Sequence, residues 1–264
     1  MSLHAFDNNS KLYVSWSEIS QYGSISQIRV KSYDNSTWST IDGGSNNGIN
    51  LRGSRNATHP SLADNGTHLF AIWSEDNGAG KGEIRSAVYD NATDSWDTNS
   101  NFQPLNYSTS YSANNPQLLY HNSSLYAIWS ETNADNRTQI RVKSYDGSSW
   151  SFVDGNNATK GINKDYTQNA SYPQLVKVTD NSSSSKLYAV WLEENGNTQV
   201  RVAEFDGTSS WNFKDGDSFD GLNLNTAKIT GKPSAAAYLN KLIVAWSETN
   251  SLGVPQIRVA KSPF

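Results

Sequence analysis

An internal repeat over all 264 residues is the feature that most constrains the fold of this chain. Five apolar runs of the LYAIWSE type each close on Trp-x-Glu, at intervals of 55 to 62 residues. Their glutamates are Glu18, Glu75, Glu131, Glu193 and Glu248. Each run is followed by Ile-Arg-Val or a close variant, with arginines Arg29, Arg85, Arg141, Arg201 and Arg258. Self-similarity at such a period indicates stacked units, as in solenoids, propellers or arrays.

Each unit has the pattern of four short strands. The first is expected to begin at a proline, as in PSLADN from Pro60, since proline is tolerated as the first residue of a strand. The second is the Trp-x-Glu run, the third contains QIRV, and the fourth begins at a tryptophan such as Trp150. Asn, Gly, Asp and Ser fill the gaps, as turns require. We therefore predict an all-β fold, a five-bladed β-propeller of four-stranded antiparallel blades.

The repeat also sets the expected domain organisation. We predict a single propeller domain over residues 1–264, with blades at approximately 1–58, 59–115, 116–172, 173–232 and 233–264. The sequence QIRVAKSPF ends the last unit after its third strand. Either this blade lacks its fourth strand, or the chain is part of a longer polypeptide. A linear β-solenoid is the alternative architecture, although its repeats are usually shorter.

Composition excludes several classes of function. The formal net charge is −4 at pH 7, so no broad positive field is present to bind nucleic acid. Cysteine is absent and the four histidines share no ligand spacing, so we predict no disulfide, metal or cofactor. The longest apolar runs have about five residues, which is too short to span a bilayer.

The turn between the third and fourth predicted strands has a distinctive sequence. Its clearest copy is Ser144-Tyr145-Asp146-Gly147-Ser148-Ser149-Trp150, which follows the strand LYAIWS. It resembles the Asp-box of the bacterial neuraminidase (BNR) repeat in sialidase-like propellers, although Gly147 is adjacent to the aspartate. The resemblance implies a propeller. A sialidase of that family would also need three clustered arginines, a tyrosine activated by a glutamate, and an acidic aspartate. Outside the repeat only Arg52, Arg55 and Arg137 are available as arginines.

The repeated glutamates and arginines flank the hairpin between the second and third strands, so we expect them at one end of each blade. A ladder of Glu–Arg pairs that ties the scaffold together is the favoured interpretation, because five identical copies suit a scaffold. The alternative is a ring of binding sites for sugar hydroxyls and carboxylates, since arginine offers a bidentate fork and tryptophan a stacking plane.

The loops that precede each proline differ in sequence, and loops on a rigid scaffold often carry binding residues. The candidate ligand-binding residues there are Arg52, Arg55, His59, Tyr107, Tyr111, Asp165 and Tyr166. Arg52, Arg55, Asp165 and Tyr166 form a conceivable composite pocket. Solvated polar loops without a ligand are the alternative.

The functional expectation is a non-catalytic, lectin-like recognition module whose partner is a glycan or a surface protein. Eleven Asn-x-Ser/Thr sequons favour an extracellular or cell-surface glycoprotein. One alternative is a sialidase-like glycoside hydrolase that uses Arg52, Arg55 and non-repeated acids. A second alternative is a structural repeat domain of a larger cell-surface protein.

Overall fold

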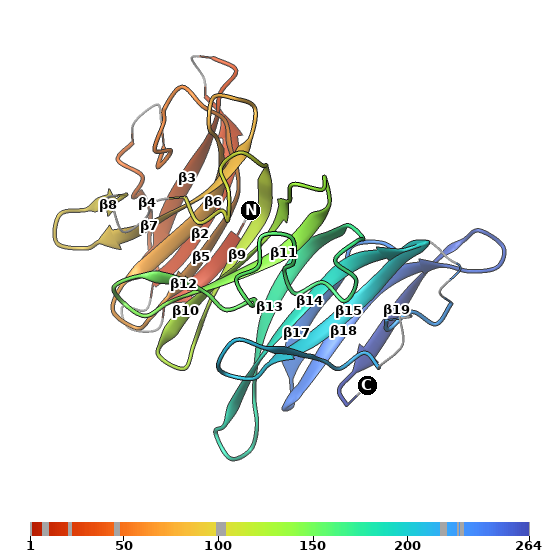
Figure 1. Cartoon of the computed structure of the whole chain (residues 1–264). Helices are drawn as coiled ribbons and strands as arrows, with labels where there is room; N and C mark the ends of the chain where they lie inside the picture. The colour runs from red at the N-terminus through yellow and green to blue at the C-terminus, as the bar shows by residue number, and fades with distance from the viewer. Residues whose placement is uncertain are drawn as a thin grey trace. The chain divides into compact units, whose positions relative to one another are not determined.

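A computed structural model describes residues 2–6, 11–20, 23–44, 48–98, 104–216, 221–225, 227 and 230–263. These residues form β-strands joined by turns and loops, without a helix. The strands make four four-stranded sheets and one three-stranded sheet, in which strands adjacent in sequence are neighbours (Figure 1). This confirms the predicted all-β fold and the organisation into four-stranded units. Among the described residues there is also no helix long and apolar enough to cross a membrane.

The chain divides into two compact units, and each is described by itself. Unit 1 comprises Met1–Glu131 with Lys143–Ser151, and unit 2 comprises Thr132–Val142 with Phe152–Phe264. The prediction of a single domain with five blade boundaries stays a prediction.

Unit 1 contains the first two sheets and part of the third. The first sheet is β1 (Ser2–Phe6), β2 (Lys11–Ile19), β3 (Ser26–Tyr33) and β4 (Trp38–Thr40). The second is β5 (Ala57–Asp64), β6 (Leu69–Asp76), β7 (Gly82–Asp90) and β8 (Ser95–Asp97). The third is β9 (Ala113–His121), β10 (Ser124–Thr132), β11 (Thr138–Tyr145) and β12 (Trp150–Phe152), which the boundary between the units crosses.

Unit 2 contains the rest of the third sheet and two more. The fourth sheet is β13 (Ala170–Thr179), β14 (Ser185–Asn195), β15 (Asn197–Phe205) and β16 (Trp211–Phe213). The fifth is β17 (Ser234–Tyr238), β18 (Lys241–Thr249) and β19 (Pro255–Lys261), without a fourth strand among the described residues.

The first strands of the second, third and fourth sheets do not begin at their prolines, so that prediction was wrong. β5, β9 and β13 begin three residues earlier, and the pairing register shifts around each proline. The residue before each proline has positive φ: His59 (55°), Asn115 (54°) and Tyr172 (53°). Because proline cannot donate to the ladder, it is placed in a β-bulge. In the fifth sheet, β17 does begin directly after Pro233.

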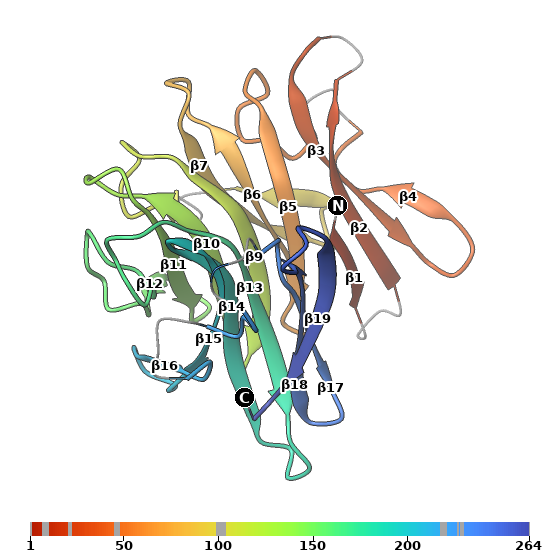
Figure 2. The same ribbon diagram turned by 90° about the vertical axis from the view of Figure 1, so that its right-hand side faces the viewer.

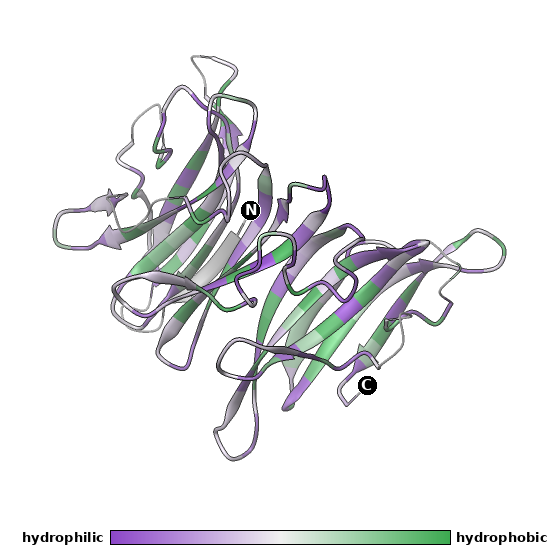
Figure 3. Cartoon of the chain, in the orientation of Figure 1, coloured by the Kyte–Doolittle hydropathy of each residue, from purple (hydrophilic) through white to green (hydrophobic). Residues whose placement is uncertain are grey.

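The core lies between successive sheets, because the central strands are buried on both faces. Trp73, Trp129 and Trp191 are fully buried. In unit 1, Ile28 and Val30 of β3 belong to the same apolar cluster as residues of β5 and β6. Figure 3 shows apolar residues alternating with polar ones along the strands. Both faces of a middle sheet are therefore covered, as stacked units require.

Candidate functional site

We call the segment between the fourth strand of one sheet and the first strand of the next an exit loop: residues 41–56, 98–112, 153–169 and 214–233. The repeated glutamate of the following sheet binds this loop. Glu75 accepts hydrogen bonds from the backbone N–H of Leu51 and of Arg52, each at 2.9 Å. Its third donor is the indole N–H of Trp73, also at 2.9 Å. Glu75 thus holds an exit loop through backbone donors 23 and 24 residues away.

The same contact recurs along the chain. Glu131 accepts from Tyr107 and Ser108, Glu193 from Lys164 and Asp165, and Glu248 from Leu224 and Asn225. In each case the tryptophan two residues earlier donates its indole N–H to the carboxylate. These four glutamates are buried. They therefore act as clamps between consecutive repeats, with both carboxylate oxygens engaged by N–H donors.

Glu18 differs from the other four. The indole of Trp16 donates to it at 2.8 Å, and Arg29 lies 3.5 Å away. Its side chain is 49% exposed. Within the described part of the chain no exit loop donates backbone N–H groups to it, so the first repeat presents an open clamp.

The repeated arginines pair mainly with aspartates of their own exit loops. The Nε atoms of Arg29 and Arg141 lie 3.0 and 2.8 Å from Asp42 and Asp154, and Nη1 of Arg201 lies 3.5 Å from Asp215. In the strand register, Arg29 and Arg201 are opposite the tryptophans, not the glutamates. The expected Glu–Arg ladder is therefore largely an Arg–Asp ladder. An aspartate four residues after the strand-opening tryptophan was the sequence signal that we missed.

An asparagine completes the docking of each exit loop. The side-chain oxygen of Asn163 accepts the N–H of Ile140 at 2.8 Å, and its amide donates to the carbonyl of Thr138 at 3.2 Å. Asn50, Asn106 and Asn223 make the corresponding bonds. The asparagine ties the loop to its own sheet, and the next glutamate ties it to the following one.

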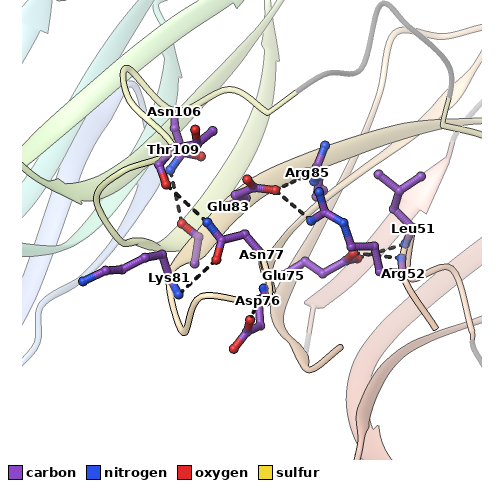
Figure 4. Close-up of polar contacts among 12 residues, drawn as sticks. Leu51, Arg52, Glu75, Asp76, Asn77, Lys81, Glu83, Arg85, Asn106 and Thr109 are labelled. Atoms are coloured by element: carbon purple, nitrogen blue, oxygen red, sulfur yellow. Dashed lines mark hydrogen bonds and ion pairs between the residues drawn. The ribbon is translucent and has the colours of Figure 1, made fainter. Parts of the chain in front are cut away.

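The second sheet departs from this scheme at Glu83. Two residues before the repeated arginine, the other four repeats have a glutamine: Gln27, Gln139, Gln199 and Gln256. Glu83 forms ion pairs with Arg85, and with Nη1 of Arg52 at 2.9 Å (Figure 4). In the β6–β7 register Glu83 is directly opposite Glu75. We call Arg52, Glu75, Glu83 and Arg85 the Glu83 cluster.

The Glu83 cluster brings two carboxylates and two guanidinium groups into a buried site. Burial raises the pKa of Glu75 and lowers that of Arg85. Like charges directly opposite on a sheet repel, so the two arginines are needed to hold the carboxylates together. Only Arg52, with a side chain 38% exposed, connects the cluster to solvent. Directly opposite strand residues have Cβ atoms about 5 Å apart, so the side chains of Glu75 and Glu83 lie close together.

The remaining predicted loop residues are scattered. The guanidinium group of Arg55 lies against Gly78. A Cβ added to Gly78 would be 2.8 Å from the Nη2 atom of Arg55. His59 is exposed beside Thr58. Tyr107 is partly exposed, and the carbonyl of Tyr111 accepts from Asn106.

The structure does not bring the expected composite pocket together within one unit. Asp165 caps a local turn through Thr167, and Lys160 lies 4.2 Å from the ring centroid of Tyr166. These residues belong to unit 2, whereas Arg52 and Arg55 belong to unit 1. The composite pocket stays a prediction.

Unit 2 contains a pocket of about 420 Å³ at the ends of β10, β13 and β14. Thr138, Asn169, Ser171, Glu194 and Thr198 contribute to its lining. The amide of Asn169 donates to Glu194 at 2.9 Å and accepts the N–H of Thr138. The pocket is polar and holds one carboxylate, so it lacks the acid pair that glycoside hydrolysis uses.

Comparison with known proteins supports a propeller fold like that of sialidases. No family model and no curated protein matches the chain. Among solved structures, the chain is similar to a Hadza microbial sialidase (TM-score 0.59, 11% identity, covering 99% of this chain and 56% of the sialidase). It is also similar to an α-L-arabinanase of Penicillium chrysogenum, with a TM-score of 0.56 and 12% identity, covering 99% of this chain and 80% of the arabinanase. A third similar structure is a GH93 α-L-arabinofuranosidase of Fusarium graminearum, with a TM-score of 0.58 and 13% identity, covering 100% of this chain and 80% of that enzyme.

These neighbours correct the functional expectation. By name they are glycoside-cleaving enzymes, which contradicts the predicted non-catalytic, lectin-like module and the prediction that the chain is not an enzyme. They support the alternative of a glycoside hydrolase better than that of a lectin-like module. The repeated glutamates and arginines are engaged in the clamps and the Arg–Asp ladder, so their repetition does not distinguish a binding module from an enzyme.

Proposed function

We propose that this protein is a glycoside hydrolase built on a sialidase-like, five-bladed propeller. The fold likeness to a sialidase, an arabinanase and an arabinofuranosidase supports the reaction class. The Glu83 cluster carries the proposal within this chain, because it is where the repeat gains a second carboxylate opposite its clamp glutamate.

The proposed chemistry assigns different roles to the two carboxylates. Glu83, paired with Arg52 and Arg85, is the carboxylate that acts on the substrate. Glu75 is fixed by three N–H donors and positions the exit loop that carries Arg52. Displacement of the partly exposed Arg52 by substrate opens access to Glu83.

Glu83→Gln tests this assignment, because it restores the residue found at the other four repeats. We expect the wild-type protein to release the chromophore from an aryl glycoside in a panel of α-L-arabinosides and sialosides. In Glu83→Gln we expect kcat to fall at least about 100-fold, the lower range for loss of an essential acid or base. Far-ultraviolet circular dichroism checks that the sheets are retained.

Gln256→Ala, at the exposed equivalent position in the fifth repeat, is the matched control and should keep full activity. Wild-type activity in Glu83→Gln would exclude the cluster as the catalytic centre. Absence of turnover on the whole panel by wild-type protein would reject the hydrolase proposal for these substrates.

We also propose that the protein acts outside the cell, on the basis of its sequons. Treatment of the native protein with a peptide N-glycosidase should increase its electrophoretic mobility. Unchanged mobility would reject glycosylation at these sequons.

A further inference from the structure

The polar pocket of unit 2 has two walls, both made of residues that belong to this unit. The hairpin between β10 and β11 contributes Thr132, Asn136 and Thr138. The fourth sheet, in which β13, β14 and β15 lie side by side (Figure 2), contributes Ser171 and Glu194 among others. Its volume of about 420 Å³ is within the usual range of small-molecule sites.

Asn169 holds the wall formed by the fourth sheet. Its amide donates to Oε2 of Glu194 at 2.9 Å, and its backbone carbonyl accepts the N–H of Glu194 at 2.8 Å. Its side-chain oxygen accepts the N–H of Thr138 at 3.0 Å, which ties this wall to the hairpin. Glu194 is exposed, and its Oε1 atom has no hydrogen-bond partner within the described ranges. One oxygen of Glu194 is therefore fixed, and the other can accept from a ligand.

Asn133 holds the wall formed by the hairpin. Its side-chain oxygen accepts the N–H groups of Asp135 at 3.0 Å and Arg137 at 2.9 Å. Its amide donates to the carbonyl of Thr159 at 3.0 Å, and the residue is buried. The turn that contains Asn136 is thus fixed from within. A site that is formed before its ligand arrives loses less conformational freedom on binding.

A smaller residue in the fourth sheet leaves room that the third sheet fills. Two residues before the proline of the first strand, the third sheet has Asn114 and the fourth has Ser171. Asn114 receives the hydroxyl of Ser74 and donates its amide to Ser112, each at 3.3 Å. Ser171 has a shorter side chain, and its hydroxyl has no hydrogen-bond partner in the described part of the chain. The pocket therefore coincides with a departure from the repeat.

The polar groups of the lining define the chemistry of a ligand. The hydroxyls of Thr132, Thr138 and Ser171 can donate and accept, the amide of Asn136 can do both, and the carboxylate of Glu194 accepts. Adjacent sugar hydroxyls likewise donate and accept, so they match this set. Glu194 is the only acidic or basic residue of the lining, so the pocket disfavours an anionic ligand.

We propose that this pocket is a second carbohydrate site, which binds a neutral mono- or disaccharide unit without cleaving it. Oε1 of Glu194 accepts from one sugar hydroxyl, and the amide of Asn136 donates to another. The inference rests on the proposed function only in taking a glycan as the substrate. The pocket lies in unit 2, whereas the Glu83 cluster lies in unit 1.

Isothermal titration calorimetry tests the proposal with xylobiose, cellobiose and maltose as neutral probes. The full-length Glu83→Gln protein is used, so that no probe is cleaved during the titration. We expect at least one neutral probe to bind with a Kd below about 1 mM. Digalacturonic acid should bind at least about 10-fold more weakly, because it brings negative charge to Glu194.

Two further substitutions locate the binding. Ser171→Asn introduces the residue of the third sheet and should fill the pocket, and Glu194→Gln removes the charge of the acceptor. Each should weaken binding at least about 10-fold, the order of one charge-assisted hydrogen bond. Ser209→Asn is the matched control, because it makes the same change at an exposed turn of the same unit and should bind as before. Far-ultraviolet circular dichroism checks that the sheets are retained.

Several results would overturn the proposal: no binding of any neutral probe at about 10 mM, unchanged binding in Ser171→Asn and Glu194→Gln, or equal binding of digalacturonic acid. Binding of Ca²⁺ alone that is lost in Glu194→Gln would assign the pocket to a cation and overturn it as well. Wild-type turnover without binding of a neutral probe would reject this site and leave the hydrolase proposal. Binding of a neutral probe without wild-type turnover would do the reverse.

Discussion

At the scale of single residues, the repeated glutamate makes different contacts in different repeats. Glu193 is buried and accepts the N–H groups of Lys164, Asp165 and Trp191. Glu18 makes only the indole contact and a longer ion pair in the described structure. Identical sequence motifs therefore differ in energetic importance, because only one has an exit loop seated on it.

We expect Glu193→Ala to destabilise the protein by about 3 kcal/mol, since it leaves one buried and two part-buried donors without an acceptor. Glu18→Ala should cost less than about 0.5 kcal/mol, because its carboxylate is already half exposed. Urea unfolding followed by tryptophan fluorescence measures both. Similar losses in the two variants would contradict the clamp assignment.

The aspartates of the turns between third and fourth strands give a pH prediction. Hydrogen bonds from the turn lower the pKa of Asp34, Asp146 and Asp206 to about 2 each. Because the folded pKa lies below the unfolded value of about 3.9, their contribution is present above that value and is lost as pH falls toward 2. Asp146→Asn keeps an acceptor without a titrating group. The thermal midpoint of this variant should change less than that of the wild type between pH 5 and pH 2, and an identical pH dependence would contradict the prediction.

At the scale of elements, the exit loops are as regular as the strands. In three of them, a described glycine packs closely against the third strand of its own sheet. A Cβ added to Gly161 would lie 2.0 Å from the carbonyl oxygen of Ile140, and Gly48 and Gly221 have similar contacts with Ile28 and Val200. At these three positions an added side chain would meet backbone, whereas the second exit loop has Pro104 at the equivalent position.

Gly161→Ala should therefore destabilise the protein by about 2 kcal/mol, the typical cost of overpacking a close contact. Gly23→Ala is the matched control, because an added Cβ there meets nothing within 4 Å and φ is not positive. Thermal unfolding of the two variants gives the comparison. A similar midpoint in both would mean that the loop shifts without cost.

At the scale of the whole molecule, stability should be distributed unevenly among the sheets. β15 has its middle residues buried, whereas β19 is mostly exposed. Amide groups in the less covered element open more easily. We expect hydrogen exchange measured by mass spectrometry to be faster in residues 255–261 than in residues 198–204. Equal protection would show that β19 is covered in solution.

Much of the architecture could be predicted from the sequence, because its signals are local. The Trp-x-Glu runs, the QIRV strands and the Asp-led turns predicted the strands β2, β3 and their counterparts. Proline was misplaced, since a bulge that holds Pro60, Pro116 or Pro173 depends on the partner strand. The candidate site was harder to predict from the sequence. Glu83 replaces the glutamine of the other repeats, but the sequence does not show that Glu83 lies opposite Glu75.

The sequence by itself determined the number of repeats, the strand composition of each and the chemistry of the turns, since alternation and turn residues act over a few neighbours. Only the tertiary structure decided which partners the charges have. Glu75, Glu131, Glu193 and Glu248 bind backbone 23 to 29 residues away, and Arg29, Arg141 and Arg201 bind aspartates of the exit loops. A buried charge is stabilised by whatever packing brings within hydrogen-bond distance, and that depends on how consecutive sheets stack.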